Sequence, residues 1–424
     1  MSALNAPDTS QPEQPSAAPV RSLAYLASTY LGLSMVFVMR EVRQLRELGL
    51  NIDVACINPP DRPLSALTAA EAEEAKRTYC IKDHGVFGAV VASIQTLLGN
   101  FFGFGRGHRL ALRLGGLDLR RQFYNTLYFT EALMIGQWMR RKGQKHLHVH
   151  LASQAATVGM LVHHIFGFGF SITVHGPDEF YDAKGQYLAE KIAAADFICC
   201  ITAFTRSQLM MFAPYEQWHK FVLARVGIDT AVFSPQPPHA PRDWFEILCI
   251  GRLTPAKGQH LLIDAVDELA RQGRSVRLRL GGNGADEASL RRHAARIQHP
   301  ECVLFEGGVN QDRIRSLYAS ADVFCLPSFA EGLPGVLMEA MAMDIPCITT
   351  NITGVPELIR DGVDGLLVAP SDVDGLTKAL ARLMDDEPLR KSIAAGSRAR
   401  VLQLHDLRRN AERLAGIFAE RVRP

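Results

Sequence analysis

Two glutamates, Glu331 and Glu339, carry the clearest chemical signal in this chain. They lie eight residues apart and are joined by Gly332-Leu333-Pro334-Gly335 and the start of an apolar helix. Because Pro334 has the fixed φ of a first helical turn, the loop after Glu331 is predicted to enter a helix whose amino end attracts an anion. The carboxylates can then bind the hydroxyl groups of a sugar and a ribose, while backbone N–H groups hold a diphosphate. This arrangement predicts a site for a sugar nucleotide.

A second motif, Gly251 to Gly258, directly follows a strand-like run that ends at Ile250. It places Arg252 and Lys257 on a short loop before a helix, where a guanidinium and an ammonium can share a diphosphate. Each such charge-assisted hydrogen bond contributes about 1.5–3 kcal/mol. Taken alone, the motif is equally compatible with two exposed loop cations.

Two more loops follow predicted strands in the same half of the chain. Gly281-Gly282-Asn283-Gly284 permits positive φ and a close backbone approach. In the segment from Phe305 to Val309, Phe305 and Gly307 are candidates for the floor of a nucleobase pocket. An ordinary turn explains the same residues equally well.

In the first half, His175 follows an apolar strand-like run, 170–174. A histidine at the carboxyl end of a strand is either positioned for chemistry or an ordinary loop histidine. Asp178 and Glu179 are candidates for contacts to an acceptor or for anchoring the loop. Gly32, in the loop after the first strand-like run, is a further candidate on the acceptor side.

Strand-like and helix-like runs alternate along the chain and predict how these loops are positioned. The strand-like runs are 22–27, 52–57, 148–152, 170–174 and 197–201, followed by 245–250, 276–280, 303–305, 323–326, 347–349 and 366–368. This alternation predicts an α/β fold with two parallel sheets, and ligands of such sheets bind at the carboxyl ends of the strands.

Composition and proline content predict the domain boundaries. Residues 1–20, rich in Pro, Ser, Ala and Gln, are expected to form a disordered leader. The first domain is expected over 21–234 and the second over 244–404, with a proline-dense linker at 235–243. The final segment, 405–424, has a helical pattern and could cross back to the first domain.

Charge and cysteine content exclude several classes of function. The 424 residues include 46 Lys and Arg and 44 Asp and Glu, so nothing in the overall charge indicates a nucleic-acid partner. The eight cysteines are scattered without a C-x-x-C pair, which argues against a zinc site or a disulfide framework. We therefore expect a reducing, cytoplasmic location.

Residues 86–121 combine an apolar stripe with an arginine cluster. Gly85 to Gly105 contains no charged side chain, but its glycines and polar residues make it a poor membrane-spanning helix. Five arginines follow, namely Arg106, Arg109, Arg113, Arg120 and Arg121. The segment is predicted either to lie on an anionic membrane, at the inner face of the cytoplasmic membrane, or to form a core helix followed by a solvated basic face.

The run from Pro327 to Ala342 resembles the E-x7-E signature of the family 4 retaining glycosyltransferases of the GT-B fold. Gly251-Arg252 with Lys257-Gly258 resembles the same family, as does Gly354-Val355-Pro356-Glu357-Leu358-Ile359 with Gly362 and Gly365. Its exopolysaccharide branch, of the colanic-acid type, is resembled by the first strand, the helix from Met35 to Glu41, the turn from Asn58 to Pro63, and His175 to Phe180. One departure is Tyr30-Leu31-Gly32, where many members carry paired glycines. The resemblance implies the GT-B architecture of two Rossmann-like domains whose parallel sheets face each other across a cleft.

The resemblance also implies roles for the motif residues. Arg252, Lys257 and the backbone N–H groups of Gly335 and Val336 are expected to bind the donor diphosphate. Glu339 is expected to bind the nucleotide ribose, Glu331 the hydroxyls of the transferred sugar, and His175 to point toward that sugar. Neither a metal nor another cofactor is expected, because the two cations and the helix dipole take the role of a divalent ion.

The function so implied is the retaining transfer of a hexose from a nucleoside diphosphate sugar to a lipid-linked or oligosaccharide acceptor, in the synthesis of exopolysaccharide or cell-surface glycan. The enzymatic alternatives are a nucleotide-sugar epimerase and a phosphorylase on the same fold. The non-enzymatic alternative is a scaffold that binds a sugar nucleotide. The identity of the base, the sugar and the acceptor depends on pocket contacts that residue patterns do not encode.

Overall fold

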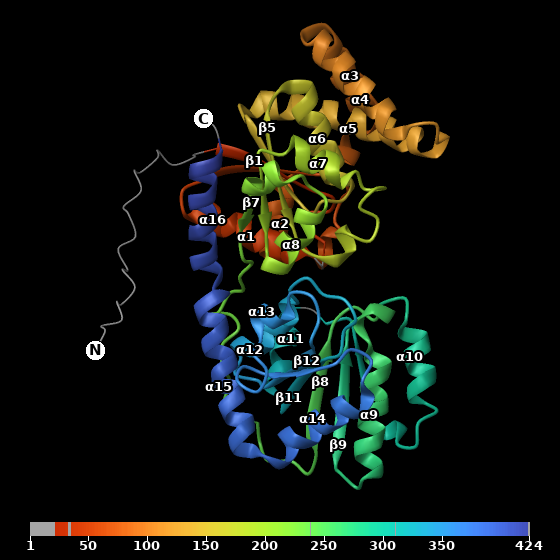
Figure 1. Cartoon of the computed structure of the whole chain (residues 1–424), viewed down its shortest axis with the longest axis vertical. Helices are drawn as coiled ribbons and strands as arrows, with labels where there is room; N and C mark the ends of the chain where they lie inside the picture. Colours follow the sequence, from red (N-terminus) through yellow and green to blue (C-terminus); the bar gives the residue numbers. More distant parts are fainter. Residues whose placement is uncertain (1–21, 33–34, 238, 310, 423–424) are drawn as a thin grey trace, which may run out of the picture.

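The computed structural model of the chain describes residues 22–32, 35–237, 239–309 and 311–422. The leader expected at 1–20 lies outside the described residues. Figure 1 shows two α/β units, one above the other, with the last two helices running along one side of both.

The N-terminal domain is built on a seven-stranded parallel sheet of order β3-β2-β1-β4-β5-β6-β7. Its strands are β1 (Ser22–Ala27), β2 (Asn51–Cys56), β3 (Tyr79–Cys80), β4 (His146–His150), β5 (Gly169–Val174), β6 (Phe197–Cys200) and β7 (Phe221–Leu223). Its helices are α1 (Val36–Glu47), α2 (Ala69–Arg77), α3 (Gly85–Gly99), α4 (Phe101–Gly115), α5 (Leu119–Lys142), α6 (Gln154–Phe166), α7 (Leu188–Ala194) and α8 (Ala203–Met211).

The C-terminal domain is built on a six-stranded parallel sheet of order β10-β9-β8-β11-β12-β13. Its strands are β8 (Phe245–Ile250), β9 (Val276–Gly281), β10 (Val303–Gly307), β11 (Val323–Leu326), β12 (Cys347–Thr350) and β13 (Leu366–Val368). The helices that follow them are α9 (Gln259–Arg271), α10 (Glu287–Ala294), α11 (Gln311–Ala319), α12 (Gly335–Ala342), α13 (Val355–Leu358), α14 (Val373–Asp385), α15 (Glu387–Leu404) and α16 (Leu407–Arg421).

Each strand-like run expected from the sequence overlaps a strand of the structure, and the prediction of two Rossmann-like α/β domains is confirmed. The strands that the sequence did not indicate, β3 and β7, are two and three residues long and form the edges of the N-terminal sheet. Each sheet reverses its strand order once. In the C-terminal sheet the reversal lies between β8 and β11. Ligands of such sheets bind where the order reverses, so the loops after β8 and β11 are the expected site.

The chain passes between the two domains at two places that lie side by side. The backbone N–H of Ile228 donates to the carbonyl of His405 at 2.8 Å, and the N–H of Leu407 donates to the carbonyl of Ile228 at 2.9 Å. A Cβ on Gly227 would lie 2.5 Å from the Cα of Leu407, so only glycine allows this approach. The two segments that connect the domains, at Ile228 and at Leu407, are therefore hydrogen-bonded to each other.

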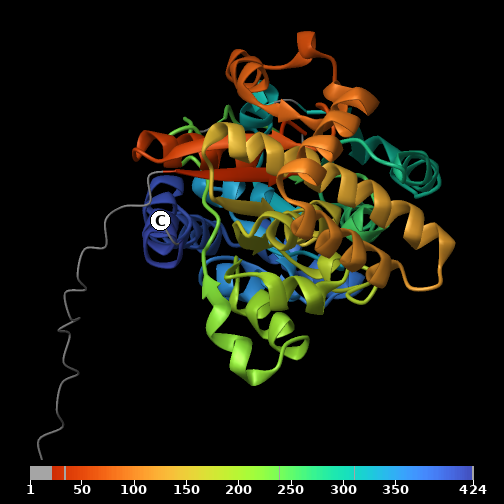
Figure 2. The same cartoon turned by 90° about the horizontal axis from the view of Figure 1, so that it is seen from above.

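After the second passage, α16 packs against α1 of the N-terminal domain. Its Phe418 is fully buried, with its ring 5.0 Å from the ring of His148 and 6.3 Å from that of Tyr25. Seen from above, the end of α16 lies beside the red elements that begin the described chain (Figure 2). The last helix of the sequence thus completes the core of the first domain.

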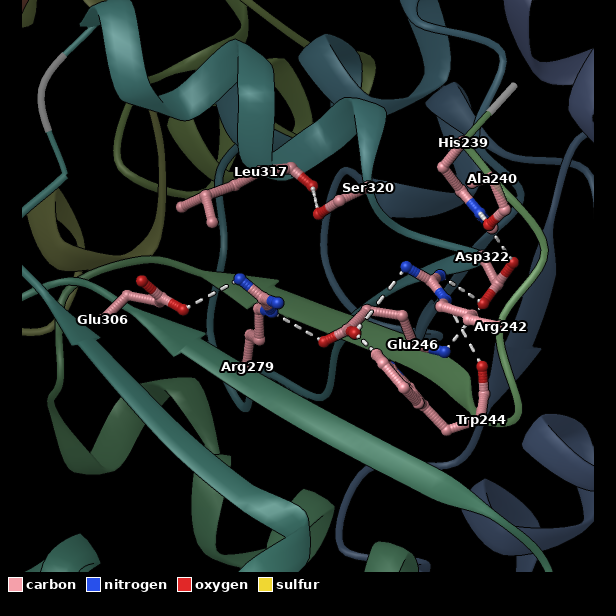
Figure 3. A network of polar contacts seen from close by, with 10 residues as sticks. All are labelled: His239, Ala240, Arg242, Trp244, Glu246, Arg279, Glu306, Leu317, Ser320 and Asp322. Atoms are coloured by element: carbon pink, nitrogen blue, oxygen red, sulfur yellow. Dashed lines mark hydrogen bonds and ion pairs between the residues drawn. The ribbon is translucent and has the colours of Figure 1, made fainter. Parts of the chain in front are cut away.

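A polar network ties the segment before β8 to the C-terminal sheet (Figure 3). The fully buried Glu246 carboxylate accepts hydrogen bonds from Arg279 at 2.8 Å and from the Trp244 indole at 2.7 Å. Asp322 accepts from Arg242 at 2.5 Å and from the backbone N–H of Glu246 at 2.7 Å. A buried carboxylate needs such partners, and here they hold the segment before β8 against the C-terminal sheet.

Helices α3 and α4 stand at the end of the N-terminal domain that is remote from the C-terminal domain (Figure 1). In α3 the small and polar residues face inward, since Ala92 and Thr96 are buried and Thr96 accepts a hydrogen bond from Gln137 of α5 at 2.9 Å. The apolar residues face solvent instead, with exposed fractions of 81% for Phe87 and 82% for Leu98. The alternative that this stripe forms a core helix is therefore wrong. In the described part of the chain, helices with the length and apolar character needed to cross a bilayer are absent.

Candidate active site

The loops after β8 and β11 meet through Lys257 and Glu331. The ammonium of Lys257 lies 2.5 Å from Oε1 of Glu331, and the Ser328 hydroxyl donates to the same oxygen at 2.6 Å. Both charged side chains are largely buried. Gly258 adopts a φ of +63°, and a Cβ there would collide with the carbonyl oxygen of Pro327. The glycine after the lysine thus lets the two loops touch.

The amino end of α12 opens beside this ion pair. Pro334 occupies the position before the helix with a φ of −72°, and α12 begins at Gly335. The first N–H groups of a helix have no partner within the helix, which leaves those of Gly335 and Val336 available to an anion. Gly335 is exposed, and a Cβ placed on it would meet no atom within 4 Å. There is consequently open space in front of this helix end.

Glu339 lies farther along α12 and connects the two domains. Its carboxylate accepts a hydrogen bond from the Tyr318 hydroxyl at 3.2 Å and lies 3.6 Å from the guanidinium of Arg40, which belongs to α1 of the N-terminal domain. Burial raises the pKa of Glu339 to about 7, although the charge of Arg40 opposes this rise. The group is therefore close to its point of half-ionisation near neutral pH.

The two domains also touch through their backbones, next to His175. A Cβ on Gly332 would collide with the carbonyl oxygen of His175, and one on Gly176 would lie 2.6 Å from the Cα of Gly332. Nearby, the Glu357 carboxylate accepts hydrogen bonds at 2.8 Å from the N–H groups of both Ala203 and Phe204. A carboxylate of one domain thus caps the amino end of α8 in the other.

The imidazole of His175 lies against other side chains of the N-terminal domain. Its Nε2 lies 3.2 Å from Nδ1 of His150, and the Phe37 ring lies 4.9 Å from the His175 ring. Burial, together with the neighbouring His150, holds the pKa of His175 well below its usual range. The ring is therefore neutral at pH 7.

Of the two acids that follow His175, Glu179 anchors the loop. Its carboxylate accepts hydrogen bonds from the backbone N–H groups of His175 at 2.5 Å and Gly176 at 2.9 Å, and from that of Ala152. Asp178 is exposed instead. Gly32 is buried near Asp61, whose Oδ2 would lie 3.4 Å from a Cβ at that position.

The remaining candidates lie around the loops after β8 and β10. Arg252 is exposed, and its carbonyl accepts a hydrogen bond from the Gln259 side chain at 3.0 Å. The guanidinium of Arg291 lies over the Phe305 ring, 4.3 Å from the ring centroid. Gly307 adopts a φ of +68°, and its carbonyl accepts from the N–H of Gly282 at 2.8 Å. Arg252 is free to reach a ligand, whereas Phe305 already stacks on a cation.

Several site residues were not singled out from the sequence, notably Arg40, Glu41 and His150. The spacing of His146, His148 and His150 in a strand was an available signal, because alternate residues of a strand share a face. Arg40 and Glu41 gave no such signal, since their partners come from other elements. Among the described residues, no group of three or more His, Cys, Asp or Glu side chains is placed to hold a metal ion.

Comparison with known proteins finds a family match in the C-terminal half of the chain. Residues 234–400 match the family described as glycosyl transferases group 1. The matched region contains Lys257, Glu331 and Glu339 and the loops that bring them together.

Two curated proteins are similar to part of this chain. WcaL of Escherichia coli K12, named for glycosyl transfer in colanic acid biosynthesis, is 38% identical over 168 residues, which cover 38% of this chain and 41% of that protein. A GDP-mannose-dependent α-(1-6)-phosphatidylinositol monomannoside mannosyltransferase of Mycolicibacterium smegmatis is 30% identical over 243 residues, which cover 54% of this chain and 63% of that protein. The chain spans about half the length of the curated relatives it matches.

Solved structures show the same architecture over nearly the whole chain. Alr3699/HepE of Anabaena in complex with UDP superposes with a TM-score of 0.70 at 16% identity, covering 94% of this chain and 100% of that one. The fold is therefore that of the GT-B glycosyltransferases, with two Rossmann-like domains.

Proposed function

We propose that this chain is a retaining glycosyltransferase that moves a hexose from a nucleoside diphosphate sugar to a lipid-linked or oligosaccharide acceptor. The observation that carries the proposal is the contact of Lys257 with Glu331 beside the open amino end of α12. The group 1 family match over 234–400 and the names of the relatives support glycosyl transfer in the synthesis of polysaccharides or glycolipids.

The donor diphosphate lies, in this proposal, between Arg252, Lys257 and the N–H groups of Gly335 and Val336. These groups supply two positive charges and a helix dipole, so binding needs no divalent ion. Glu339 accepts hydrogen bonds from the ribose and Glu331 from the sugar hydroxyls. Phe305 and Gly307 remain candidates for the floor of the base pocket.

In the reaction, the bond between the sugar C1 and the diphosphate oxygen breaks, and the diphosphate keeps the electron pair. The acceptor hydroxyl forms the new bond to C1 on the same face, and its proton passes to the departing phosphate oxygen. Positioning and electrostatic stabilisation of the leaving group account for the rate, because no carboxylate nucleophile is required.

Binding of UDP, GDP and ADP, and of their sugars, tests the donor site through the rise in thermal unfolding temperature. The nucleotide that stabilises the wild type is then used with Lys257→Ala and Arg252→Ala. Loss of one preorganised contact of this kind raises the barrier by about 2.7–4 kcal/mol. Both variants are expected to fold and to lose transfer, and near-normal turnover by either would contradict the assignment. Transfer that persists in excess EDTA is expected if no metal takes part.

The alternatives give different results in the same assays. An epimerase would convert the donor in the absence of an acceptor, and a phosphorylase would show the absorbance of bound pyridoxal. A scaffold would bind nucleotide without hydrolysing or transferring the sugar. Retention is tested by determining the anomeric configuration of the product.

Residues 86–121 are proposed to hold the protein on an anionic membrane. The outward apolar side chains of α3 and α4 include Phe87, Leu98, Phe101 and Phe102, with exposed fractions of 66–85%. The arginines from Arg106 to Arg121 are exposed on α4 and on the first turn of α5, where they can contact lipid phosphates. Such a surface suits an enzyme whose acceptor is a lipid.

Sedimentation with vesicles tests this surface. The wild type is expected to sediment with vesicles of phosphatidylglycerol at low salt and to remain in solution with phosphatidylcholine. The triple variant Phe87→Ser/Leu98→Ser/Phe102→Ser is expected to lose binding. Failure of the wild type to sediment would contradict the proposal. A dimer that forms with rising protein concentration and is abolished in the triple variant would also contradict it, because the apolar side chains of α3 and α4 would then be covered by a second copy of the chain.

A further inference from the structure

The side chains of Glu41, His150 and His175 form a hydrogen-bonded row. Nε2 of His150 lies 2.9 Å from Oε1 of Glu41, and Nδ1 of His150 lies 3.2 Å from Nε2 of His175. The row joins three separate elements, α1, β4 and the loop after β5. His150 is 1% exposed, so water does not compete for its two bonds.

The carboxylate of Glu41 sets the direction of every hydrogen bond in this row. An ionised carboxylate can only accept, so Nε2 of His150 carries a hydrogen and donates it to Glu41. If His150 carries only this hydrogen, its Nδ1 is an acceptor. Nε2 of His175 must then donate to it. With a single hydrogen on His150, the row places the hydrogen of His175 on Nε2 and the lone pair on Nδ1.

Among the described residues, the side chains that surround the row leave both nitrogens of His150 to Glu41 and His175. The Tyr25 hydroxyl donates to the same Glu41 oxygen at 3.0 Å, and the Phe37 ring packs 6.1 Å from the His150 ring. The neighbouring His148 does not extend the row, because its nitrogens are bonded to the hydroxyls of Ser171 at 2.8 Å and Thr173 at 2.9 Å. The row ends at His175.

Nδ1 of His175 lies at the end of the row and is the nitrogen that a ligand could bind. In the described part of the chain, no residue hydrogen-bonds to its Nδ1. The His175 backbone touches Gly332, the residue after Glu331, so this histidine belongs to a loop at which the two domains meet. An acceptor nitrogen at this place is suited to a sugar hydroxyl.

We propose that Glu41 and His150 are positioning residues that hold His175 in the Nε2–H tautomer and thereby present Nδ1 as an acceptor for a hydroxyl of the donor sugar. The sugar part of this inference rests on the proposed function, whereas the tautomer does not. The depressed pKa of His175, caused by burial and by His150, agrees with a ring that acts as a neutral acceptor. The role of His175 is then hydrogen bonding and orientation of the sugar, with no proton transfer.

The tautomer is measurable without substrate, in two-bond ¹H–¹⁵N spectra of the full-length protein labelled at histidine. The His175 signals are assigned by their absence in His175→Gln. The wild type is expected to show the Nε2–H pattern for His175. Glu41→Leu and His150→Phe, which remove the acceptor and the relay, are expected to give a mixture of tautomers. Tyr25→Phe is the matched control, because it removes a hydrogen bond to Glu41 without interrupting the row.

The kinetic consequence is a reduced kcat with unchanged nucleotide binding. Removing the group that orients a metal-ligating histidine typically changes affinity or activity about 10- to 100-fold. By analogy, Glu41→Leu and His150→Phe are expected to lower kcat by about that factor, while the Kd for the nucleoside diphosphate stays the same. If the wild type transfers no sugar, the proposed function fails and the tautomer result still stands. A wild-type His175 with its hydrogen on Nδ1 would overturn the inference. So would an unchanged tautomer in folded Glu41→Leu and His150→Phe, or the same mixture in Tyr25→Phe.

Discussion

Arg40 and Glu339 form an ion pair across the domain boundary, with 3.6 Å between the guanidinium NH1 and Oε1. Arg40 also lies over the Phe233 ring, 5.5 Å from its centroid, and Glu339 also accepts the Tyr318 hydroxyl. The carboxylate proposed to bind the ribose is therefore already in contact with the N-terminal domain. A bound nucleotide has to share it with Arg40 or displace it.

Nucleotide binding is predicted to weaken as the pH falls through about 7, the pKa to which burial raises Glu339. An ionised carboxylate accepts both ribose hydroxyls, whereas the protonated group is a weaker acceptor. Arg40→Gln removes the charge that opposes the rise, so the midpoint should move to higher pH. Calorimetric titration at a series of pH values measures it, with Glu339→Gln as the baseline that removes the contribution of this group. A midpoint that moves to lower pH in Arg40→Gln would refute the coupling.

The same raised pKa predicts a pH-dependent stability. The folded state binds the Glu339 proton more tightly than the unfolded state, whose pKa is the ordinary value of 4.5. The free energy of unfolding therefore falls as the pH rises from 4.5 to about 7 and is then level. Glu339→Gln removes this loss, which amounts to about 3 kcal/mol. Thermal unfolding should show the variant gaining stability over the wild type at pH values above this window and not below it, and an equal gain on both sides would count against the assignment.

Lys257→Ala is predicted to destabilise the protein as well as to stop transfer. The change leaves the buried Glu331 carboxylate with Ser328 as its remaining side-chain donor, at a cost of about 1–3 kcal/mol. Lys257→Ala/Glu331→Gln removes the unpaired charge and should recover part of that loss while staying inactive. Chemical denaturation of the variants measures the effect, and a double variant less stable than Lys257→Ala would contradict it.

Gly332→Ala is predicted to separate the domains. The added Cβ would collide with the His175 carbonyl, so the loop after β11 could no longer reach the loop after β5. Transfer should be lost and the radius of gyration in small-angle scattering should rise. Gly416→Ala in α16 is the matched control, because a Cβ there meets nothing within 4 Å. Scattering curves that coincide for Gly332→Ala and the wild type would show that this contact does not hold the domains together.

Local patterns were sufficient for the fold and for the parts of the candidate site that lie close together in the sequence. The alternating runs predicted both sheets because central parallel strands are continuously apolar, whereas β3 and β7 are short edge strands with too few residues to form a pattern. Glu331 and the amino end of α12 were predictable because the loop and helix are adjacent in the sequence. The pairs Arg40–Glu339 and His150–His175 were not, since each joins residues far apart in the chain.

The orientation of α3 shows a different limit. Its apolar residues do follow a helical spacing, but periodicity defines a stripe without saying which side is buried. Gly88, Ala92 and Thr96 allow α3 to approach α5 closely, and a Cβ on Gly88 would lie 3.2 Å from the Met134 side chain. Close packing of small residues therefore decided the orientation.

The paired passages at Ile228 and Leu407 define how the two halves of the molecule can move. Two adjacent connections act as a hinge, because they permit rotation about the line through them and resist twisting or sliding. Opening along this axis would carry Gly332 away from His175 and part Arg40 from Glu339, while α16 travels with the N-terminal half. A ligand would then enter when the two domains rotate apart and be enclosed when they rotate back. The two short connecting segments would limit how far the domains can open.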